Sequence, residues 1–108
     1  MFDKKKITVN PEVDITGFTF VKAAEAIGKE GLVCWGHLIY NSKFGEGVAL
    51  VANDGCLYNL PSRYVSDFKT CTDEENEFVM SGKKLEFREY ETKAGQKTVI
   101  ASIDGKDI

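Results

Sequence analysis

The stretch VALVANDGCLYNL, residues 48–60, decides the fold that this sequence predicts. Two apolar runs meet at Asn53-Asp54-Gly55. Asp-Gly between apolar runs is a strong hairpin signal, because both central residues of a type I′ turn need a positive φ and these two tolerate it. The stretch therefore predicts two antiparallel strands joined by a tight turn. Asp54 is assigned to that turn and not to a calcium loop, whose terminal glutamate is missing.

Further strands are predicted on both sides of this hairpin. Residues 32–40 are rich in β-branched and aromatic side chains, and Gly36 in their middle predicts a bulge. Residues 84–90 alternate between apolar and polar side chains, a turn follows at 93–96, and residues 97–103 form the returning strand. The polar tail at 104–108 is predicted to fray.

Two short helices are predicted between the hairpin and the last pair of strands. Ser62, directly after Pro61, is predicted to cap the first helix. Thr72-Asp73-Glu74-Glu75 fits a capping box for the second helix, which Gly82 is predicted to end. The acids of this motif are interpreted as a solvated helix start and not as metal ligands.

The pattern before residue 32 supports more than one interpretation. Residues 1–14 are predicted to form an irregular arm or a short edge strand, because Pro11 interrupts any ladder. Phe20, Ala23, Ala24 and Ile27 have the spacing of one helical face, which predicts a short N-terminal helix. An extended interpretation of residues 17–21 competes with that helix.

The element order predicts a mostly β, α+β fold. From residue 32 onward the order is three strands, a helical region and two strands, which is the order of the OB-fold, a five-stranded, partly open barrel. A curved antiparallel sheet with helices on one face fits the same signals. We expect a single domain over residues 1–108, with an arm at 1–14 and an OB-like core at 32–103.

Composition and motifs exclude several function classes. The net charge is −3, and no signal peptide or membrane span is predicted, so a cytoplasmic protein is expected. Cys34, Cys56 and Cys71 form no CxxC pair and His37 is the single histidine, so reduced structural thiols are expected and no metal site is. No catalytic triad or phosphate loop is recognisable, which predicts neither an enzyme nor a cofactor.

Aromatic and basic residues are the candidates for a binding surface. On an OB-fold, bases stack on exposed rings while basic side chains follow the backbone. The nucleic-acid-binding candidates are Lys43, Phe44, Tyr58, Arg63, Arg88, Tyr90 and Lys97. The alternative for each is a core ring or a solubilising charge.

Residues 58–103 resemble a pattern in small accessory proteins of bacterial phages and plasmids. The pattern has a strand ending in Leu60-Pro61, an aromatic-bearing helix, the acidic helix start, Ser81-Gly82-Lys83, and a strand that turns near Gly95. Such accessory proteins of mobile elements include OB-like single-stranded DNA-binding relatives and small inhibitors of host defence or host enzymes. The resemblance assigns no functional residue.

Two functions stay open at this point. The first is a non-enzymatic OB-like accessory protein that binds single-stranded nucleic acid. The second is a small inhibitor or regulator that binds a host protein, and it is motivated by the acidic balance and the small size. No membrane partner is expected, and self-association is open. A small-molecule-binding or catalytic barrel ranks behind both.

Overall fold

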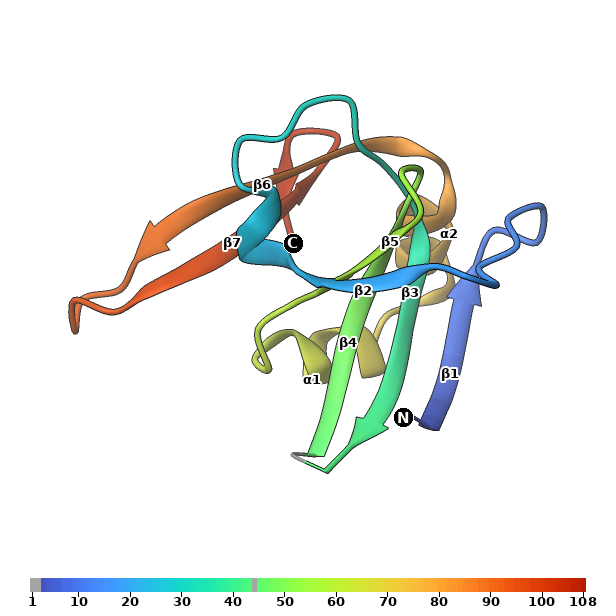
Figure 1. Ribbon diagram of the computed structural model, residues 1–108, viewed down its shortest axis with the longest axis horizontal. Helices are drawn as coiled ribbons and strands as arrows, with labels where there is room; N and C mark the ends of the chain where they lie inside the picture. Colours follow the sequence, from blue (N-terminus) through green and yellow to red (C-terminus); the bar gives the residue numbers. More distant parts are fainter. Residues whose placement is uncertain (1–2, 44) are drawn as a thin grey trace.

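The computed structural model describes residues 3–43 and 45–108, with side chains from residue 8 onward. Within that part the chain forms eight strands, two short α-helices and one 3-10 helix (Figure 1). In chain order they are β1 (Asp3–Val9), β2 (Thr19–Lys22), η1 (Ala23–Ala26), β3 (Val33–Ser42), β4 (Gly45–Ala52), β5 (Cys56–Asn59), α1 (Tyr64–Lys69), α2 (Asp73–Met80), β6 (Lys83–Glu91), β7 (Lys97–Ile103) and β8 (Lys106–Asp107).

The predicted hairpin at residues 48–60 is confirmed as β4 and β5, with Leu50 opposite Tyr58. The predicted turn type is wrong. Gly55 has a φ of 83°, but Asp54 does not have a positive φ. Instead, Asp54 Oδ1 accepts a hydrogen bond from the Cys56 backbone N–H at 3.2 Å, while Asn53 Oδ1 accepts one from Val33 N–H at 2.9 Å. The Asp54 bond closes the turn without a second left-handed residue, and the Asn53 bond ties the turn to β3.

The strands form one mixed open sheet in the order β2-β5-β4-β3-β6-β7-β8, with β1 also paired to β3. From β3 onward the predicted element order is confirmed, but the strands form an open mixed sheet and not the predicted five-stranded OB-like barrel. One edge of β3 is shared, since β1 pairs along residues 36–41 and β6 pairs only at Val33 and Cys34. The β6–β7 hairpin therefore leaves the sheet at an angle (Figure 1). The curved-sheet alternative fits better, although β2 runs parallel to β5.

The region before β3 differs from its prediction. Residues 3–9 form strand β1, and the short helix predicted from the spacing of Phe20 to Ile27 is replaced by β2 and the short η1. The competing extended interpretation of this region fits β2, because Phe20 and Val21 suit a strand. Ala23 and Ala26 are buried in the main core. Gly36 forms the predicted bulge, and a Cβ there would lie 2.3 Å from the Thr8 carbonyl oxygen.

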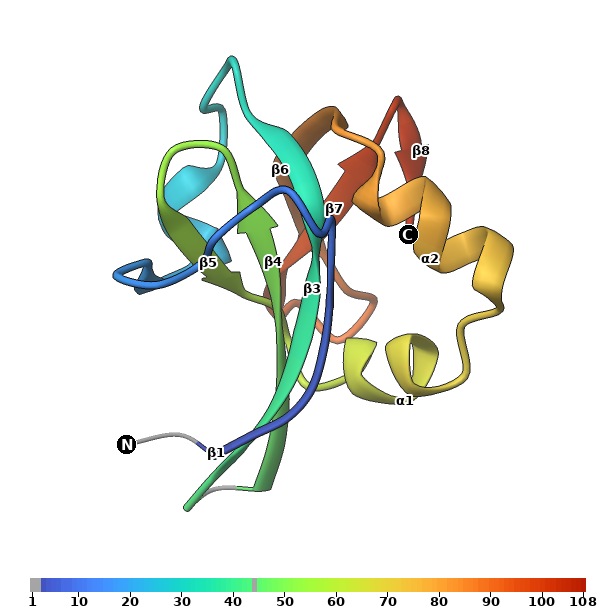
Figure 2. The same ribbon diagram turned by 90° about the vertical axis from the view of Figure 1, so that its right-hand side faces the viewer.

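The helical segment covers one side of the sheet (Figure 2). The main core lies between the helical segment and the sheet. A second apolar cluster around Leu38 and Val51 lies on the other face of the sheet. The predicted capping box is confirmed, with Thr72 Oγ1 accepting from Glu75 N–H and Glu75 Oε1 accepting from Thr72 N–H. Ser62 is not a side-chain cap, because Arg63 holds the N-cap position of α1.

No helix in residues 3–43 and 45–108 has the length and apolar character needed to cross a membrane.

Candidate functional site: an acidic groove on the helical face

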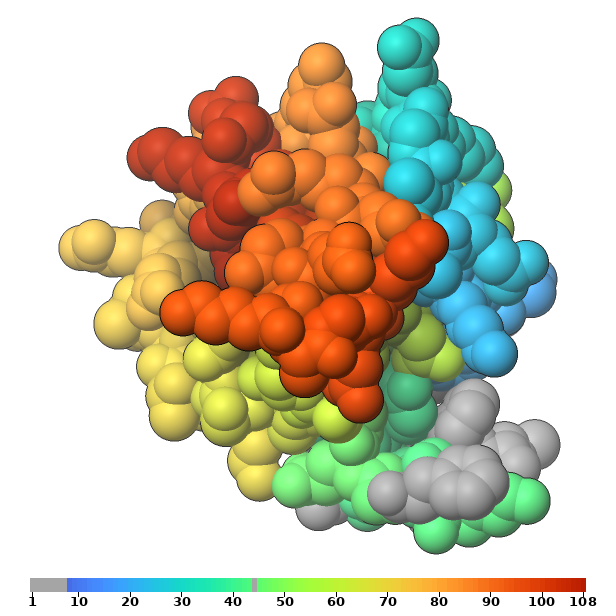
Figure 3. Space-filling model, turned by 90° about the vertical axis from the view of Figure 1, so that its left-hand side faces the viewer, coloured from blue at the N-terminus to red at the C-terminus, as the bar shows by residue number. Residues whose placement is uncertain are grey.

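The structure does not bring the predicted nucleic-acid-binding residues together. Lys43 lies in the β3–β4 turn, at one end of the molecule, and Phe44 lies outside the described residues. The β6–β7 hairpin carries three other candidates and projects from a different end (Figures 1 and 3). The six candidates within the described residues therefore do not form one surface.

Tyr58 cannot act as a stacking platform, because its side chain is only 2 % exposed. Its ring packs against Phe87 at a centroid distance of 5.2 Å. Its hydroxyl donates to Asp54 Oδ2, which also accepts from Lys29 Nζ at 2.8 Å. Burial and the adjacent Asp54 carboxylate raise the pKa of Tyr58. The Lys29–Asp54–Tyr58 cluster fastens the β4–β5 turn to the loop before β3.

The Arg63 side chain is hydrogen-bonded to the edge of β7. Its guanidinium donates to the Val99 carbonyl oxygen at 2.6 Å and to Thr98 Oγ1 at 2.8 Å. The neighbouring Tyr64 hydroxyl accepts from the Ala101 backbone N–H at 3.2 Å. Arg63 and Tyr64 thus satisfy backbone groups that an exposed strand edge would leave open.

Arg88, Tyr90 and Lys97 lie on the β6–β7 hairpin but on different faces. Arg88 and Tyr90 share one face, opposite Ile100 and Thr98, whereas Lys97 is opposite Glu91 on the other. Tyr90 is 48 % exposed. Arg88 forms an ion pair with Asp107, and Lys97 Nζ lies 3.7 Å from Glu89. Of the seven candidates, Tyr90 alone presents a described ring to solvent.

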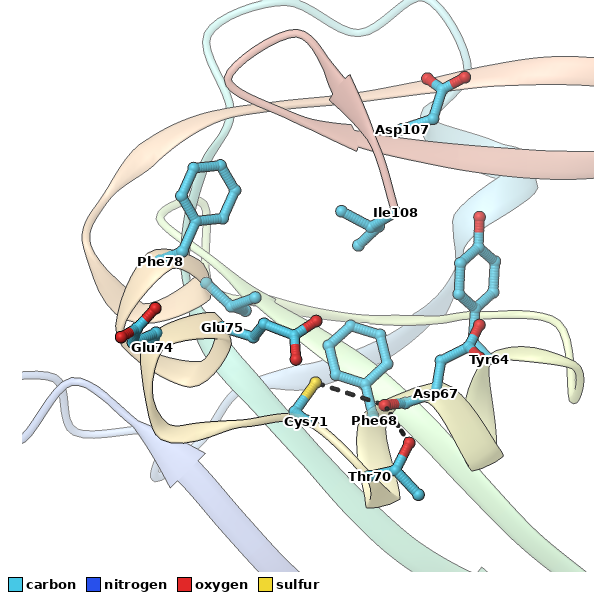
Figure 4. Close-up of a pocket in the computed structure, with 11 residues that line it drawn as sticks. Tyr64, Asp67, Phe68, Thr70, Cys71, Glu74, Glu75, Phe78, Asp107 and Ile108 are labelled. Carbon is cyan, nitrogen blue, oxygen red and sulfur yellow. Dashed lines mark hydrogen bonds between the residues drawn. The ribbon is translucent and has the colours of Figure 1, made fainter.

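A groove lies between α1, α2 and the last residues of the described chain. Its volume is about 490 Å³, which falls within the range of ligand pockets. Apolar side chains from α1, α2 and the end of the described chain line it, namely Phe68, Phe78, Val79 and Ile108. Figure 4 shows Ile108 in the middle of this lining and Glu75 reaching from α2 toward α1.

Carboxylates surround the apolar lining. The acids that line the groove are Asp67, Glu74, Glu75 and Asp107. Glu75 is held by the capping box, whose hydrogen bonds from Thr72 lower its pKa, and Asp107 is paired with Arg88 and accepts from Ser102. Among the described residues, no cation lies within ion-pair distance of Asp67 or Glu74. These two carboxylates are therefore available to a ligand.

The groove concentrates the charge of the molecule. Residues 62–82 contain two basic and five acidic side chains, so this segment alone carries a net charge of −3, equal to that of the whole chain. The Asp67 carbonyl oxygen adds a further acceptor, which already binds Cys71 Sγ at 3.4 Å and Thr70 Oγ1 at 3.3 Å (Figure 4). An apolar floor with an acidic rim suits a cationic group on an apolar stem.

Sequence reasoning missed the groove because its third wall was predicted to fray. The tail instead forms β8, which pairs with Ser102 and Ile103 of β7. Ile108 N–H then donates to the Ala101 carbonyl oxygen at 3.0 Å, and Ile108 packs against the main core. Apolar Ile108 after a polar turn was the available signal for a returning strand.

The described residues do not form a metal-binding cluster. Within residues 3–43 and 45–108, no group of three His, Cys, Asp or Glu side chains is arranged to hold a metal ion. Within the described residues the three cysteines form no disulfide, and burial raises the pKa of Cys34 to about 12.

Comparison of the chain with protein-family models, with curated proteins and with solved structures gives no match. The resemblance to phage and plasmid accessory proteins stays a prediction.

Proposed function

We propose that the chain is a non-enzymatic binding protein whose groove receives a basic segment of a protein partner. The observation that carries the proposal is the combination of a 490 Å³ hollow, an apolar floor and the unpaired carboxylates of Asp67 and Glu74. An arginine or lysine side chain can lay its methylene groups on Phe68 while its charged end reaches the rim. Small acidic proteins that occupy basic sites on a partner act as inhibitors or regulators, which is the class we favour.

Titration with a designed peptide tests this proposal. The probe is an end-blocked peptide of arginine and leucine residues, and its counterpart has glutamate in place of arginine. Titrated into labelled protein, the basic peptide should shift the NMR signals of residues 64–79, and the acidic peptide should leave them unchanged. An absence of binding at low salt would contradict the proposal.

A charge-matched pair of variants locates the site. Asp67→Lys with Glu74→Lys reverses two groove charges, and Glu86→Lys with Glu89→Lys makes the same charge change on the β6–β7 hairpin. We expect the double substitution in the groove to lower the affinity for the basic peptide about tenfold or more, and the double substitution on the hairpin to lower it about twofold. The reason is that salt screens the attraction of distant charges more than that of charges close to the ligand. Equal weakening by both pairs would mean that net charge alone attracts the peptide.

Single-stranded nucleic acid is a second candidate ligand, favoured by the exposed ring of Tyr90. A base could stack on this ring with Arg88 nearby on the same face, which is a common mode of single-strand binding. The OB-like order of the elements from β3 to β7 is consistent with this candidate. Fluorescence anisotropy with a labelled single-stranded oligonucleotide tests it. Binding that Tyr90→Ala weakens and that Asp67→Lys with Glu74→Lys leaves intact would favour nucleic acid over the groove.

A further inference from the structure

The two groove carboxylates that have no ion-pair partner among the described residues belong to different helices. Asp67 is in α1, and Glu74 is in the first turn of α2. In Figure 4, Asp67 lies beside Phe68. Glu74 lies across the apolar lining, beside Phe78. A cation that pairs with one of these carboxylates therefore leaves the other without a partner.

The other two acids of the groove already have partners. Glu75 Oε1 accepts from Thr72 N–H at 3.0 Å in the capping box, so a cation drawn to Glu75 would compete with the start of α2. Asp107 is paired with Arg88 and also accepts from Ser102 Oγ at 2.7 Å. An arginine of the chain itself thus already binds one carboxylate of the lining. A ligand is left with one carboxylate on each helix.

The floor between these two carboxylates is apolar and small. Phe68 and Val79 are each 4 % exposed, whereas Phe78 and Ile108 are only partly buried and offer more apolar surface to a ligand. The hollow has a volume of about 490 Å³. Two turns of an α-helix, about 10 Å across, would fill more than about 800 Å³. An extended segment therefore fits this space better than a helix.

We infer that the groove recognises an extended segment in which two basic side chains flank an apolar one. This inference rests on the proposed function. One basic side chain pairs with Asp67, and the other pairs with Glu74. The apolar side chain between them covers Phe78 and Ile108.

The spacing of the two cations supplies the selectivity. Alternate residues of an extended chain share one face, so the recognised pattern is basic, apolar and basic at every second position. Two adjacent arginines point to opposite faces, so one of them faces solvent while the other reaches the groove. The spaced pattern is the same in both directions, and the groove therefore needs no fixed chain direction to bind it.

Two end-blocked peptides of identical composition test the inference. The spaced peptide has arginine, serine, leucine, serine and arginine in that order between flanking serines. The adjacent peptide has the two arginines side by side and the leucine at one end. The protein is used as the native chain, as Asp67→Asn, as Glu74→Gln and as Glu77→Gln, which makes the same charge change on α2 outside the groove lining. Calorimetry gives the affinities, and circular dichroism checks that each variant is folded.

The expected result is a preference for the spaced peptide that needs both carboxylates. The native chain and the Glu77→Gln control should bind the spaced peptide about fivefold more tightly than the adjacent peptide, and Asp67→Asn or Glu74→Gln should each remove this preference. Equal affinities of the native chain for the two peptides would overturn the inference and leave the proposed function standing. A preference that survives either groove substitution would also overturn it. Failure of both peptides to bind the native chain would remove the proposed function and the inference together.

Discussion

The helical segment and the β6–β7 hairpin both flank the sheet, but they use charge in different ways. Residues 62–82 have a net charge of −3, and residues 83–103 have five basic and three acidic side chains. The hairpin pairs several of its charges along its strands, as with Lys84 and Glu86 or Lys97 and Glu89. The helical segment leaves Asp67 and Glu74 unpaired beside a hollow. Charge composition alone therefore does not identify a binding surface, and shape decides which charges remain available.

The largest expected difference concerns burial of an aromatic ring in each region. Phe68 forms the groove floor and belongs to the main core, where it is 4 % exposed, whereas Tyr90 on the hairpin is 48 % exposed. Phe68→Ala should lower the free energy of unfolding by about 3–5 kcal/mol, and Tyr90→Ala should change it by less than about 0.5 kcal/mol. Urea denaturation measures both. Similar losses would show that the hairpin face is packed as tightly as the helical face.

The glycines that end these regions should differ by a smaller amount. Gly82 and Gly95 both have a positive φ, but a Cβ at Gly82 would lie 2.6 Å from the Trp35 ring, and one at Gly95 has no atom within 4 Å. Gly82→Ala should therefore cost about 1–3 kcal/mol more than Gly95→Ala, because it must also displace the indole. Trp35 fluorescence is an independent measurement and should shift in the Gly82 variant alone.

The next difference separates a structural cation from a solvated one. Arg63→Ala removes the hydrogen bonds to Val99 and Thr98 and uncovers the β7 edge, so it should lower the free energy of unfolding by about 1–2 kcal/mol. Lys97→Ala removes a 3.7 Å surface ion pair and should have almost no effect. Thermal denaturation at two protein concentrations checks both the stability and any association through the uncovered edge. An unchanged free energy of unfolding in Arg63→Ala would mean that water replaces the hydrogen bonds of the guanidinium at this edge.

Local patterns predicted the frame of the molecule well. The hairpin turn at Gly55, the bulge at Gly36 and the capping box at Thr72 each depend on a few adjacent residues, and each is present. The OB-like barrel was predicted wrongly, because barrel formation depends on which strand occupies the free edge of β3. That edge is taken by β1, whose partners lie about thirty residues away in the sequence.

The candidate site was much harder to predict. An exposed and a buried tyrosine have the same sequence signal, so Tyr58 and Tyr90 could not be separated before their burial was known. The groove needs residues from α1, α2 and the chain end, and no spacing in the sequence brings Phe68, Phe78 and Ile108 together. The acidic helix start was visible as a motif, but only the returning Ile108 makes it the wall of a hollow.

Two threonines provide a smaller comparison of the same regions. Thr72 Oγ1 accepts from Glu75 N–H at the start of α2, and Thr92 Oγ1 accepts from Gln96 N–H in the hairpin turn, both at 3.2 Å. Thr72→Ala should cost about 1 kcal/mol, because a buried helix face depends on that cap. Thr92→Ala should cost less, since water can satisfy the exposed turn. Chemical denaturation of both variants beside the native chain measures the difference, and a larger effect at Thr92 would contradict the comparison.

The smallest expected effect is a pH dependence confined to the helical segment. Hydrogen bonds from the Thr72 backbone and side chain lower the pKa of Glu75. A carboxyl group with a lowered pKa in the folded state contributes stability above its ordinary pKa of about 4.3, and this contribution is lost as the pH falls through the folded pKa. Glu75→Gln should therefore be less stable than the native chain at pH 6 and approach it as the pH falls toward 3. Glu89→Gln on the hairpin is the control and should follow the native chain throughout. A Glu75→Gln difference that stays constant from pH 6 to pH 3 would mean that the capping box does not depend on the charge of Glu75, and that hydrogen-bond geometry alone holds the acidic wall of the groove.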